Sequence, residues 1–258
     1  MQEWDPESLI NVELNKSEEN FAIVVLNRRI LLPVDVTKSL WQQASLRCLV
    51  DGGANRWHTF LQQNCSEGEL KWPDFLTGDF DSLQEETMTY FQENSSSDVT
   101  KIVNTPDQNE TDFTKSLRVL KSSLERLNVK NIIVLQEFSG RLDQIMGNIN
   151  TLYKCGDILD NHRLFLLSSC SMTWLLKPGQ HSIQIPKELC DQNRWCSLLP
   201  IGDKSVVTSD GLKWNLHNDI LGFGGMVSSS NSYSKEIVTI TTDNHIVWSM
   251  GWFSFEDD

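Results

Sequence analysis

The 258 residues include 22 basic and 35 acidic side chains, a formal net charge of −13, and 39% are hydrophobic, with nine Trp and eleven Phe. This apolar content is typical of an ordered globular protein with one large or two modest domains, and it argues against a disordered chain. The acidic balance argues against a nucleic-acid partner, because binding a polyphosphate backbone requires a basic surface that displaces counterions.

The first 20 residues are polar and acidic and show no apolar periodicity, so we expect 1–20 to form a loose N-terminal tail. They lack the basic start and apolar centre of a signal peptide, and the sequence contains no run of about 18 apolar residues. The six cysteines include no C-x-x-C pair, and several lie beside apolar residues, which favours buried reduced thiols over zinc ligands or disulfides. We therefore expect a cytosolic (cytoplasmic) protein with no membrane partner.

Apolar runs and helical patterns alternate over residues 21–176. The uninterrupted apolar run at 21–26 is typical of a buried strand in a parallel sheet. Further strands are predicted at 49–50, 75–76, 101–103, 132–135, 163–167 and 172–176, and helices at 40–46, 57–63, 82–93, 113–127 and 144–153. This alternation predicts βα units and an α/β domain with a mainly parallel sheet.

The pattern changes at Lys177-Pro178-Gly179, which is a turn signal. Short β-type runs separated by Gly, Asn, Asp and Ser follow, at 181–185, 196–200, 204–209, 211–216, 225–227, 237–242 and 246–252. No helix of useful length is indicated there. The sequence therefore predicts an all-β sandwich domain over 177–258.

Two carboxylates are separated by one residue in the stretch Asp79-Phe80-Asp81. On an extended segment, side chains two residues apart point the same way, so these carboxylates are expected to converge. They would repel unless a cation lay between them, and Mg²⁺ prefers carboxylate oxygens and the phosphates of a substrate. Taken alone, such a pair is more often two solvated loop charges.

Three further polar clusters follow or precede predicted elements, at 51–56, 105–115 and 139–144. The glycine pair in the first cluster allows backbone N–H groups to approach a phosphate, although a simple tight turn explains it equally well. In the second, Thr111 or Asp112 can cap the following helix. Turns that carry acids after successive strands are where open α/β sheets bind ligands, at the carboxyl ends of the strands.

Taken together, these segments resemble thiamin pyrophosphokinase, specifically its eukaryotic form. The resemblance rests on five segments in the order and spacing of that family: DGGANR (51–56), PDFLTGDFDS (73–82), TPDQNETDFTKSL (105–117), GRLDQIMGNINTL (140–152) and GLKWNL with VSSSNSY (211–233). It implies that 21–176 forms a catalytic, ATP- and Mg²⁺-binding α/β domain and that 177–258 forms a thiamin-binding β-sandwich domain. The implied reaction transfers the pyrophosphoryl group of ATP to the hydroxyethyl arm of thiamin, giving thiamin diphosphate and AMP.

The resemblance also implies roles for individual residues. Mg²⁺ would be bound by Asp79, Asp81 and Asp112, with Asp51 nearby, although an N-cap is the alternative role for Asp112. Residues implied to contact ATP are Asp51, Gly52, Gly53, Ala54, Asn55 and Lys115. Residues implied in catalysis are Asp79, Asp81, Asp112, Arg141 and Asp143, with Arg141 compensating phosphate charge and Asp143 acting as base or orienting the hydroxyl. Residues implied to contact thiamin are Gln108, Gln144, Ser228, Ser230 and Asn231.

In the resembled family, the sandwich of one chain completes the site of another, so the resemblance implies a homodimer with ATP and thiamin as its small-molecule partners. Lys115 and Arg141 taken singly are more often surface cations. Trp214 is expected to be a buried tryptophan of the sandwich. One departure from the family is the sequence Gln136-Glu137, which replaces a usual glycine pair before Gly140-Arg141 and affects the expected loop geometry.

Two other functions compete with this interpretation. A dimer that binds thiamin without catalysis would not need the aspartates, since a cationic ligand requires no Mg²⁺–phosphate site. Another nucleotide-dependent diphosphokinase or phosphohydrolase sharing the α/β half would not account for the matching segment at 211–233. The phosphate-loop and dinucleotide fingerprints are absent from the sequence, which gives no support to an ordinary P-loop kinase or NAD enzyme.

Overall fold

The chain forms two compact units, one built on parallel strands and the other mainly on antiparallel strands. The structure is a computed structural model and describes residues 1–10, 20–93 and 100–252. One unit spans Glu18–Ser169, and the other combines Met1–Ser17 with Cys170–Asp258. The predicted fold class, a mainly parallel α/β domain and an all-β sandwich, is confirmed.

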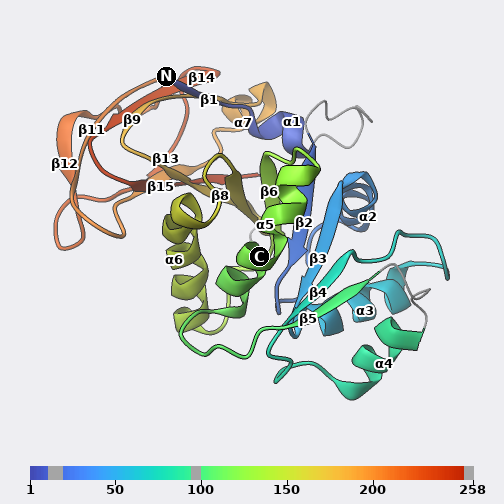
Figure 1. Ribbon diagram of the computed structural model, residues 1–258. Helices are drawn as coiled ribbons and strands as arrows, with labels where there is room; N and C mark the ends of the chain where they lie inside the picture. Colours follow the sequence, from blue (N-terminus) through green and yellow to red (C-terminus); the bar gives the residue numbers. More distant parts are fainter. Residues whose placement is uncertain (11–19, 94–99, 253–258) are drawn as a thin grey trace. The chain divides into compact units, whose positions relative to one another are not determined.

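The α/β unit contains six strands in the order β7-β6-β2-β3-β4-β5, and every neighbouring pair among them is parallel (Figure 1). Their bounds are Phe21–Val25 for β2, Leu46–Val50 for β3, Phe75–Gly78 for β4, Lys101–Asn104 for β5, Asn131–Leu135 for β6 and Arg163–Leu167 for β7. Strands β2, β3 and β6 are buried along their whole length, as the apolar runs predict.

Helices alternate with these strands, and those that follow β3 and β6 begin at or just after the turns that carry polar clusters. Their bounds are Val34–Gln43 for α2, Gly53–Asn64 for α3, Glu85–Glu93 for α4, Asp112–Arg126 for α5 and Leu142–Ile158 for α6. Helix α5 packs against β3 and β4 and also contacts α6, and its buried side chains include Phe113, Leu117, Leu120 and Leu124. Helix α3 packs against β2 and β3. The parallel arrangement therefore brings the carboxyl ends of β2, β3 and β4 to one edge of the sheet.

The β unit contains two sheets. The first has the order β1-β9-β14-β11-β12 and the second the order β13-β10-β15-β8. Their bounds are Gln2–Trp4 for β1, Ser171–Leu176 for β8, Gly179–Gln184 for β9, Cys196–Leu199 for β10, Ser205–Asp210 for β11, His217–Leu221 for β12, Ser228–Asn231 for β13, Ile237–Thr242 for β14 and Ile246–Gly251 for β15. Two five-residue helices, α1 (Pro6–Ile10) and α7 (Lys187–Asp191), accompany them.

Three tryptophans occupy the core of this unit. Trp174 lies with its ring centroid 5.6 Å from that of Trp4 and 6.1 Å from that of Trp248, and all three side chains are buried. Because Trp4 belongs to the first sheet and the other two to the second, this contact joins the two layers of the sandwich.

The expectation of a loose tail over 1–20 is wrong for its first ten residues. Strand β1 pairs in parallel with β9, and the Nε1 of Trp4 donates a hydrogen bond to Nδ1 of His181 at 3.1 Å. A three-residue strand anchored by one tryptophan is too short to show periodicity, which explains the error. Residues 11–19 of that prediction lie outside the described residues, and Asn20 is exposed, without helix or strand structure.

The expected boundary at 176/177 differs from the one in the structure. Strand β8 was expected to close the α/β domain, but it pairs antiparallel with β15 and belongs to the β unit, which resumes at Cys170. A mostly apolar strand such as Ser171–Leu176 can be buried in a parallel or an antiparallel sheet, so its residue pattern does not indicate which sheet it joins.

Two expectations about the sandwich are also wrong. Residues 211–216 form a turn rather than a strand, and the strand β12 begins after them at His217. Gly211 has a φ of +91°, and a Cβ there would lie 2.3 Å from the carbonyl oxygen of Ile237, so the chain bends where it was expected to run straight. Trp214, in that turn, is 57% exposed instead of buried.

Cys48, Cys155 and Cys196 are buried, as expected of this set, whereas Cys170 is exposed. Within the described part of the chain, every helix is too short or too polar to cross a membrane.

Candidate active site

A cavity of the α/β unit, about 340 Å³ in volume, opens at the carboxyl ends of its strands. Its walls come from the residues that follow β2, β3 and β4 and from the beginnings of α5 and α6. Residues from all four polar segments of the sequence, around Asp51, Asp79, Asp112 and Arg141, therefore line one cavity although they are far apart along the chain.

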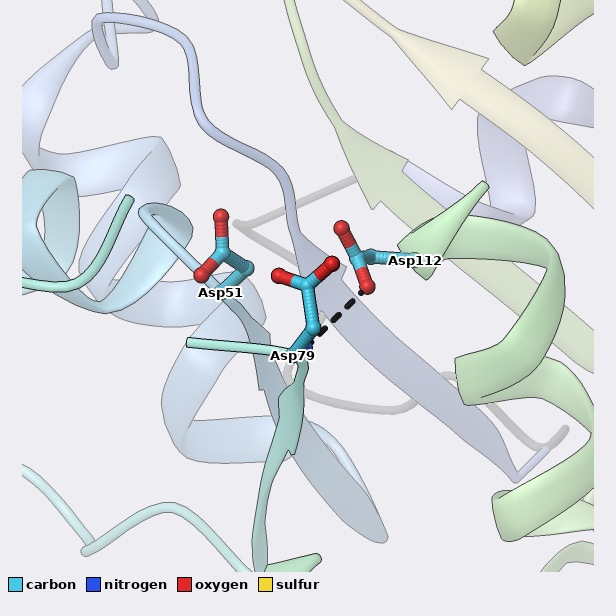
Figure 2. Close-up of side chains that lie close together, drawn as sticks. All are labelled: Asp51, Asp79 and Asp112. Atoms are coloured by element: carbon cyan, nitrogen blue, oxygen red, sulfur yellow. Dashed lines mark hydrogen bonds between the residues drawn. The ribbon is translucent and has the colours of Figure 1, made fainter. Parts of the chain in front are cut away.

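Three carboxylates converge in this cavity, and Figure 2 shows them pointing toward one another. Asp51 lies in the turn after β3, Asp79 directly follows β4, and Asp112 is the first residue of α5. One oxygen from each lies within 4.8 Å of the others. The backbone N–H of Asp79 also donates a hydrogen bond to Oδ1 of Asp112 at 3.3 Å.

The backbone around Asp51 is specialised for this approach. Asp51 has a left-handed φ of +46°, and its N–H donates a hydrogen bond to the carbonyl of Thr77 at 2.7 Å. Gly78, with a φ of +149°, ends the neighbouring strand, and a Cβ there would lie only 2.8 Å from the Cβ of Asp51. A glycine at 78 is therefore what lets the chain of β4 pass so close to this carboxylate.

The electrostatics of the cluster are unfavourable without a positive partner. Burial, with the nearby charge of Asp112, raises the pKa of Asp51. A hydrogen bond from Nε2 of Gln108 at 2.8 Å lowers the pKa of Asp79, so this carboxylate stays ionised. Closely spaced carboxylate oxygens of this kind form the ligand set that hard divalent cations such as Mg²⁺ prefer. The three aspartates therefore fit a magnesium site.

Lys115 lies beside the cluster but has little freedom to bind a ligand. Its Nζ is 2.8 Å from Oδ1 of Asp112, and it donates hydrogen bonds to the carbonyls of Thr105 at 2.6 Å and Asp107 at 2.8 Å. These three contacts match the three donors of an ammonium group. The buried Lys115 thus ties Asp112 to the segment that carries Gln108, while it also lines the cavity.

Thr111, rather than Asp112, caps helix α5. The side-chain oxygen of Thr111 accepts a hydrogen bond from the N–H of Thr114 at 3.2 Å. The carboxylate of Asp112 is therefore available to the cavity, and the alternative N-cap role for it does not hold.

Asp81 lines the cavity but lies outside the carboxylate cluster among the described residues. The expected convergence of Asp79 and Asp81 assumed an extended segment, and that assumption is wrong. Strand β4 ends at Gly78, and Phe80 has a left-handed φ of +67°, which breaks the two-residue alternation. The exposed Asp81 instead accepts a hydrogen bond from Oγ of Ser82 at 3.0 Å. Asp51, which the resemblance implies to lie near the metal, belongs to the cluster, and the metal contact of Asp81 stays a prediction.

The glycine-rich turn at Gly52, Gly53, Ala54 and Asn55 does not line the cavity. A Cβ on Gly53 would lie 2.2 Å from the carbonyl oxygen of Val25, so this glycine permits close packing of α3 on β2. Asn55 is occupied with the following loop: its Nδ2 donates to the carbonyl of Ser82 at 2.8 Å, and its Oδ1 accepts from the N–H of Gln84 at 3.0 Å. These contacts position the loop after Asp81, and the predicted ATP contacts of this turn stay predictions.

Arg141 and Gln144 line the cavity, whereas Asp143 does not. Arg141 and Asp143 form an exposed ion pair, with Nε of Arg141 donating to Oδ1 of Asp143 at 3.1 Å. This hydrogen bond lowers the pKa of Asp143, which makes that carboxylate a weaker base. The geometry favours a role for Asp143 in holding Arg141 over one in proton transfer.

Gln136 and Glu137, which replace the usual glycine pair, are both buried. The carboxylate of Glu137 accepts hydrogen bonds from the N–H of Ser169 at 2.8 Å and from its Oγ at 3.0 Å. The two larger residues are therefore accommodated by turning inward from β6, and Gly140 still adopts a left-handed φ of +80°. The cavity residues without a predicted role include Asn27 and Arg28, and the only signal for these two is their position in the segment that leaves β2.

The remaining predicted thiamin contacts lie in the β unit. Ser228, Ser230 and Asn231 belong to β13. The buried amide of Asn231 accepts from the N–H of Trp214 at 3.2 Å and donates to its carbonyl at 2.8 Å, so Asn231 fixes the backbone of that exposed tryptophan. The ammonium of Lys213 lies 4.9 Å from the centroid of the Trp214 ring, a cation–π distance.

Comparison with known proteins gives consistent results. Residues 37–166 match the family profile for the catalytic domain of thiamin pyrophosphokinase, and residues 180–247 match the profile for its vitamin B1 binding domain. Among curated relatives, thiamine pyrophosphokinase 3 of Oryza sativa is 36% identical over 89% of this chain and 86% of its own, and thiamine pyrophosphokinase 2 of Arabidopsis thaliana is 34% identical over 89% and 85%.

Solved structures show the same fold. Thiamin pyrophosphokinase from Candida albicans superposes with a TM-score of 0.82 at 24% identity, covering 98% of this chain and 93% of its own.

Proposed function

The chain belongs to the thiamin pyrophosphokinase family, and on that premise we propose that it transfers the pyrophosphoryl group of ATP to the hydroxyl of thiamin, releasing AMP. The protein is thus a transferase of thiamin diphosphate formation. The observation that carries this proposal is the group of Asp51, Asp79 and Asp112 in the cavity of the α/β unit.

These aspartates would bind Mg²⁺, which when bound neutralises phosphate charge and orients the phosphoryl group for in-line attack. Asp81 lies in the same cavity, outside the three-carboxylate group, and we assign it the outer part of this site. Such an arrangement suits ATP, because a protein of net charge −13 requires local cations to accept a polyanionic substrate.

The residues around the cluster would orient its parts. Gln108 donates to Asp79 and keeps that carboxylate ionised, while Lys115 fixes Asp112 and the backbone at Thr105 and Asp107. Arg141, held by Asp143 at the edge of the cavity, is placed to contact the phosphate chain through its planar fork. The predicted contacts of Gln108 and Gln144 with thiamin are compatible with their position in the same cavity.

For thiamin, the β unit offers an exposed aromatic ring. Thiamin carries a cationic ring, and the exposed face of Trp214 attracts cations, as the position of Lys213 over it indicates. Ser228, Ser230 and Asn231 all belong to strand β13. The two serines supply hydroxyls, and Asn231 holds the backbone of Trp214 in place. We further infer a homodimer in which the β unit of one chain completes the cavity of its partner. A cytosolic location and the lack of a nucleic-acid partner stay predictions from the sequence.

The reaction is tested by chromatography of the nucleotides after incubation of the purified protein with Mg-ATP, with and without thiamin. We expect AMP in the presence of thiamin, and loss of turnover when EDTA removes the metal. Formation of ADP instead of AMP would point to an ordinary kinase.

The shared site is tested by mixing two impaired variants, Asp79→Asn and Trp214→Ala, and assaying at a thiamin concentration well below the KM of the unaltered protein, where the weaker thiamin binding of Trp214→Ala limits its rate. A heterodimer restores one intact site, so partial recovery of activity is expected. Mixing without any recovery, while subunits exchange, would rule out a site built from two chains.

A further inference from the structure

Arg28 is a cavity residue with no role in the sequence analysis. It lies two residues beyond Leu26, in the segment that leaves β2, and it lines the same cavity as the three aspartates. Its side chain is partly buried, so the guanidinium is held at the cavity wall rather than extended into solvent.

The three cations of the cavity differ in how their charge is used. Lys115 is paired with Asp112 at 2.8 Å, and Arg141 is paired with Asp143. Arg28 forms no ion pair with any carboxylate in the described part of the chain. It is therefore the cavity cation whose positive charge is not already compensated by a carboxylate of the described residues.

The guanidinium of Arg28 is nevertheless held in place. Its Nη2 donates a hydrogen bond of 2.6 Å to Oε1 of Gln144, in the first turn of α6. The backbone of Gly140 lies against it, because a Cβ on this left-handed residue would be 3.7 Å from Nη1 and 3.9 Å from Cζ. One amide contact leaves most of the five N–H donors of the guanidinium for a ligand.

We propose that Arg28 binds the polyphosphate chain of ATP and supplies charge compensation that Lys115 and Arg141 do not. A planar, always protonated fork pairs with two phosphate oxygens at once, and an orienting contact from Gln144 reduces the entropy lost on binding. This inference rests on the proposed function, since it assumes that the cavity takes a nucleoside triphosphate. It makes Arg28 a substrate-binding residue that acts beside the metal site.

Isothermal titration with ATP and excess Mg²⁺ tests the proposal on Arg28→Met and Arg28→Lys. Loss of a charge-assisted contact to phosphate is expected to raise the dissociation constant for ATP by about 10- to 100-fold in Arg28→Met. Arg28→Lys keeps the charge but loses the fork, so we expect a smaller loss of about 3- to 10-fold.

Arg29→Met provides the matched control. Arg29 is the next residue, is exposed, and does not line this cavity, so its variant should bind ATP as the unaltered protein does. ATP binding by Arg28→Met at normal affinity, or an equal loss in the Arg28 and Arg29 variants, would overturn the proposal. The titration needs no turnover: absence of AMP formation by the unaltered protein would refute the proposed reaction, while the ATP affinities would still decide the role of Arg28.

Discussion

The two units of this protein place their predicted functional residues in different ways. In the α/β unit, residues from separate segments of the chain converge on one cavity, because parallel strands end at the same edge of the sheet. In the β unit, the residues predicted to contact thiamin come from a single strand, β13. The side-chain amide of the buried Asn231 forms hydrogen bonds with the backbone of Trp214. The first unit assembles a charged site, whereas the second presents an aromatic surface.

This difference indicates a division of chemistry. The cavity of the α/β unit contains carboxylates that repel one another and need a cation, which suits phosphate chemistry. Trp214 offers a flat apolar face with one polar support, which suits binding of a heteroaromatic cation. Substitutions in the two units should therefore affect different kinetic constants.

The largest effect is expected for Asp79→Asn. Removing one carboxylate of the cluster should lower kcat by well over ~10²-fold, because the metal site loses a charged ligand. Asp81→Asn, the matched change two residues away and outside the cluster, should have a clearly smaller effect. Steady-state AMP formation and the thermal midpoint are measured for both variants. Equal losses in the two would contradict the assignment of Asp81 to the outer part of the site.

Gly78→Ala tests whether the approach of β4 to Asp51 is needed. A Cβ at 78 would lie 2.8 Å from that of Asp51 on a backbone of positive φ, so the cluster must shift, and we expect a loss of about 10²-fold in kcat. Gly147→Ala in α6 is the control, since its Cβ would meet only Cγ2 of Thr111 at 3.4 Å. Normal kinetics in Gly78→Ala would show that the cluster geometry is not limiting.

A smaller and different effect is expected from Trp214→Ala in the β unit. The KM for thiamin should rise by about 10-fold through the loss of an aromatic contact, with the KM for ATP unchanged. Trp195→Ala, also exposed in the β unit, serves as the control. A rise in the KM for ATP would break the proposed division between the two units.

The smallest effect concerns Glu110, at the cavity wall. Hydrogen bonds from Arg118, at 2.8 and 2.9 Å, lower the pKa of Glu110 from 4.5 to about 2, and Lys154 adds to the shift. A depressed carboxyl pKa stabilises the fold above pH 4.5, and this contribution is lost as the pH falls toward 2.

Because Arg118 is largely exposed, the ion pair contributes only about 0.5 kcal/mol to the free energy of unfolding. Urea denaturation at about pH 6 and about pH 2.5 should show Glu110→Gln losing less stability on acidification than the unaltered protein. A parallel decline in both proteins would contradict this assignment.

Much of the α/β unit could be predicted from the sequence, because buried parallel strands leave continuous apolar runs and helices leave an apolar face. The convergence of Asp79 and Asp112 follows from the position of the turns that carry them, and the structure confirms that they meet. The resemblance implies that Asp51 lies near the metal, but the absence of Asp81 from the three-carboxylate group among the described residues could not be predicted, because Phe80 has a left-handed φ that interrupts the alternation of side chains. Backbone conformations of this kind leave little trace in a single sequence.

Contacts between distant segments account for the other errors. Strand β1 is defined by its pairing with β9, and strand β8 by its pairing with β15, so neither assignment is readable from local pattern. Arg28 follows an apolar strand and belongs to no motif. Its place in the cavity, and the lack of an ion pair to a carboxylate of the described residues, are seen only in the structure. The exposure of Trp214 likewise depends on the turn at Gly211.

The central claim is that the aspartate cavity carries out pyrophosphoryl transfer from ATP to thiamin. Phosphorus NMR of a reaction containing Mg-ATP and thiamin tests it most directly, with Asp79→Asn run in parallel. We predict equal amounts of AMP and a diphosphate ester of thiamin from the unaltered protein, and neither product from the variant. Formation of ADP with a monophosphate ester, or equal product from Asp79→Asn, would contradict the account.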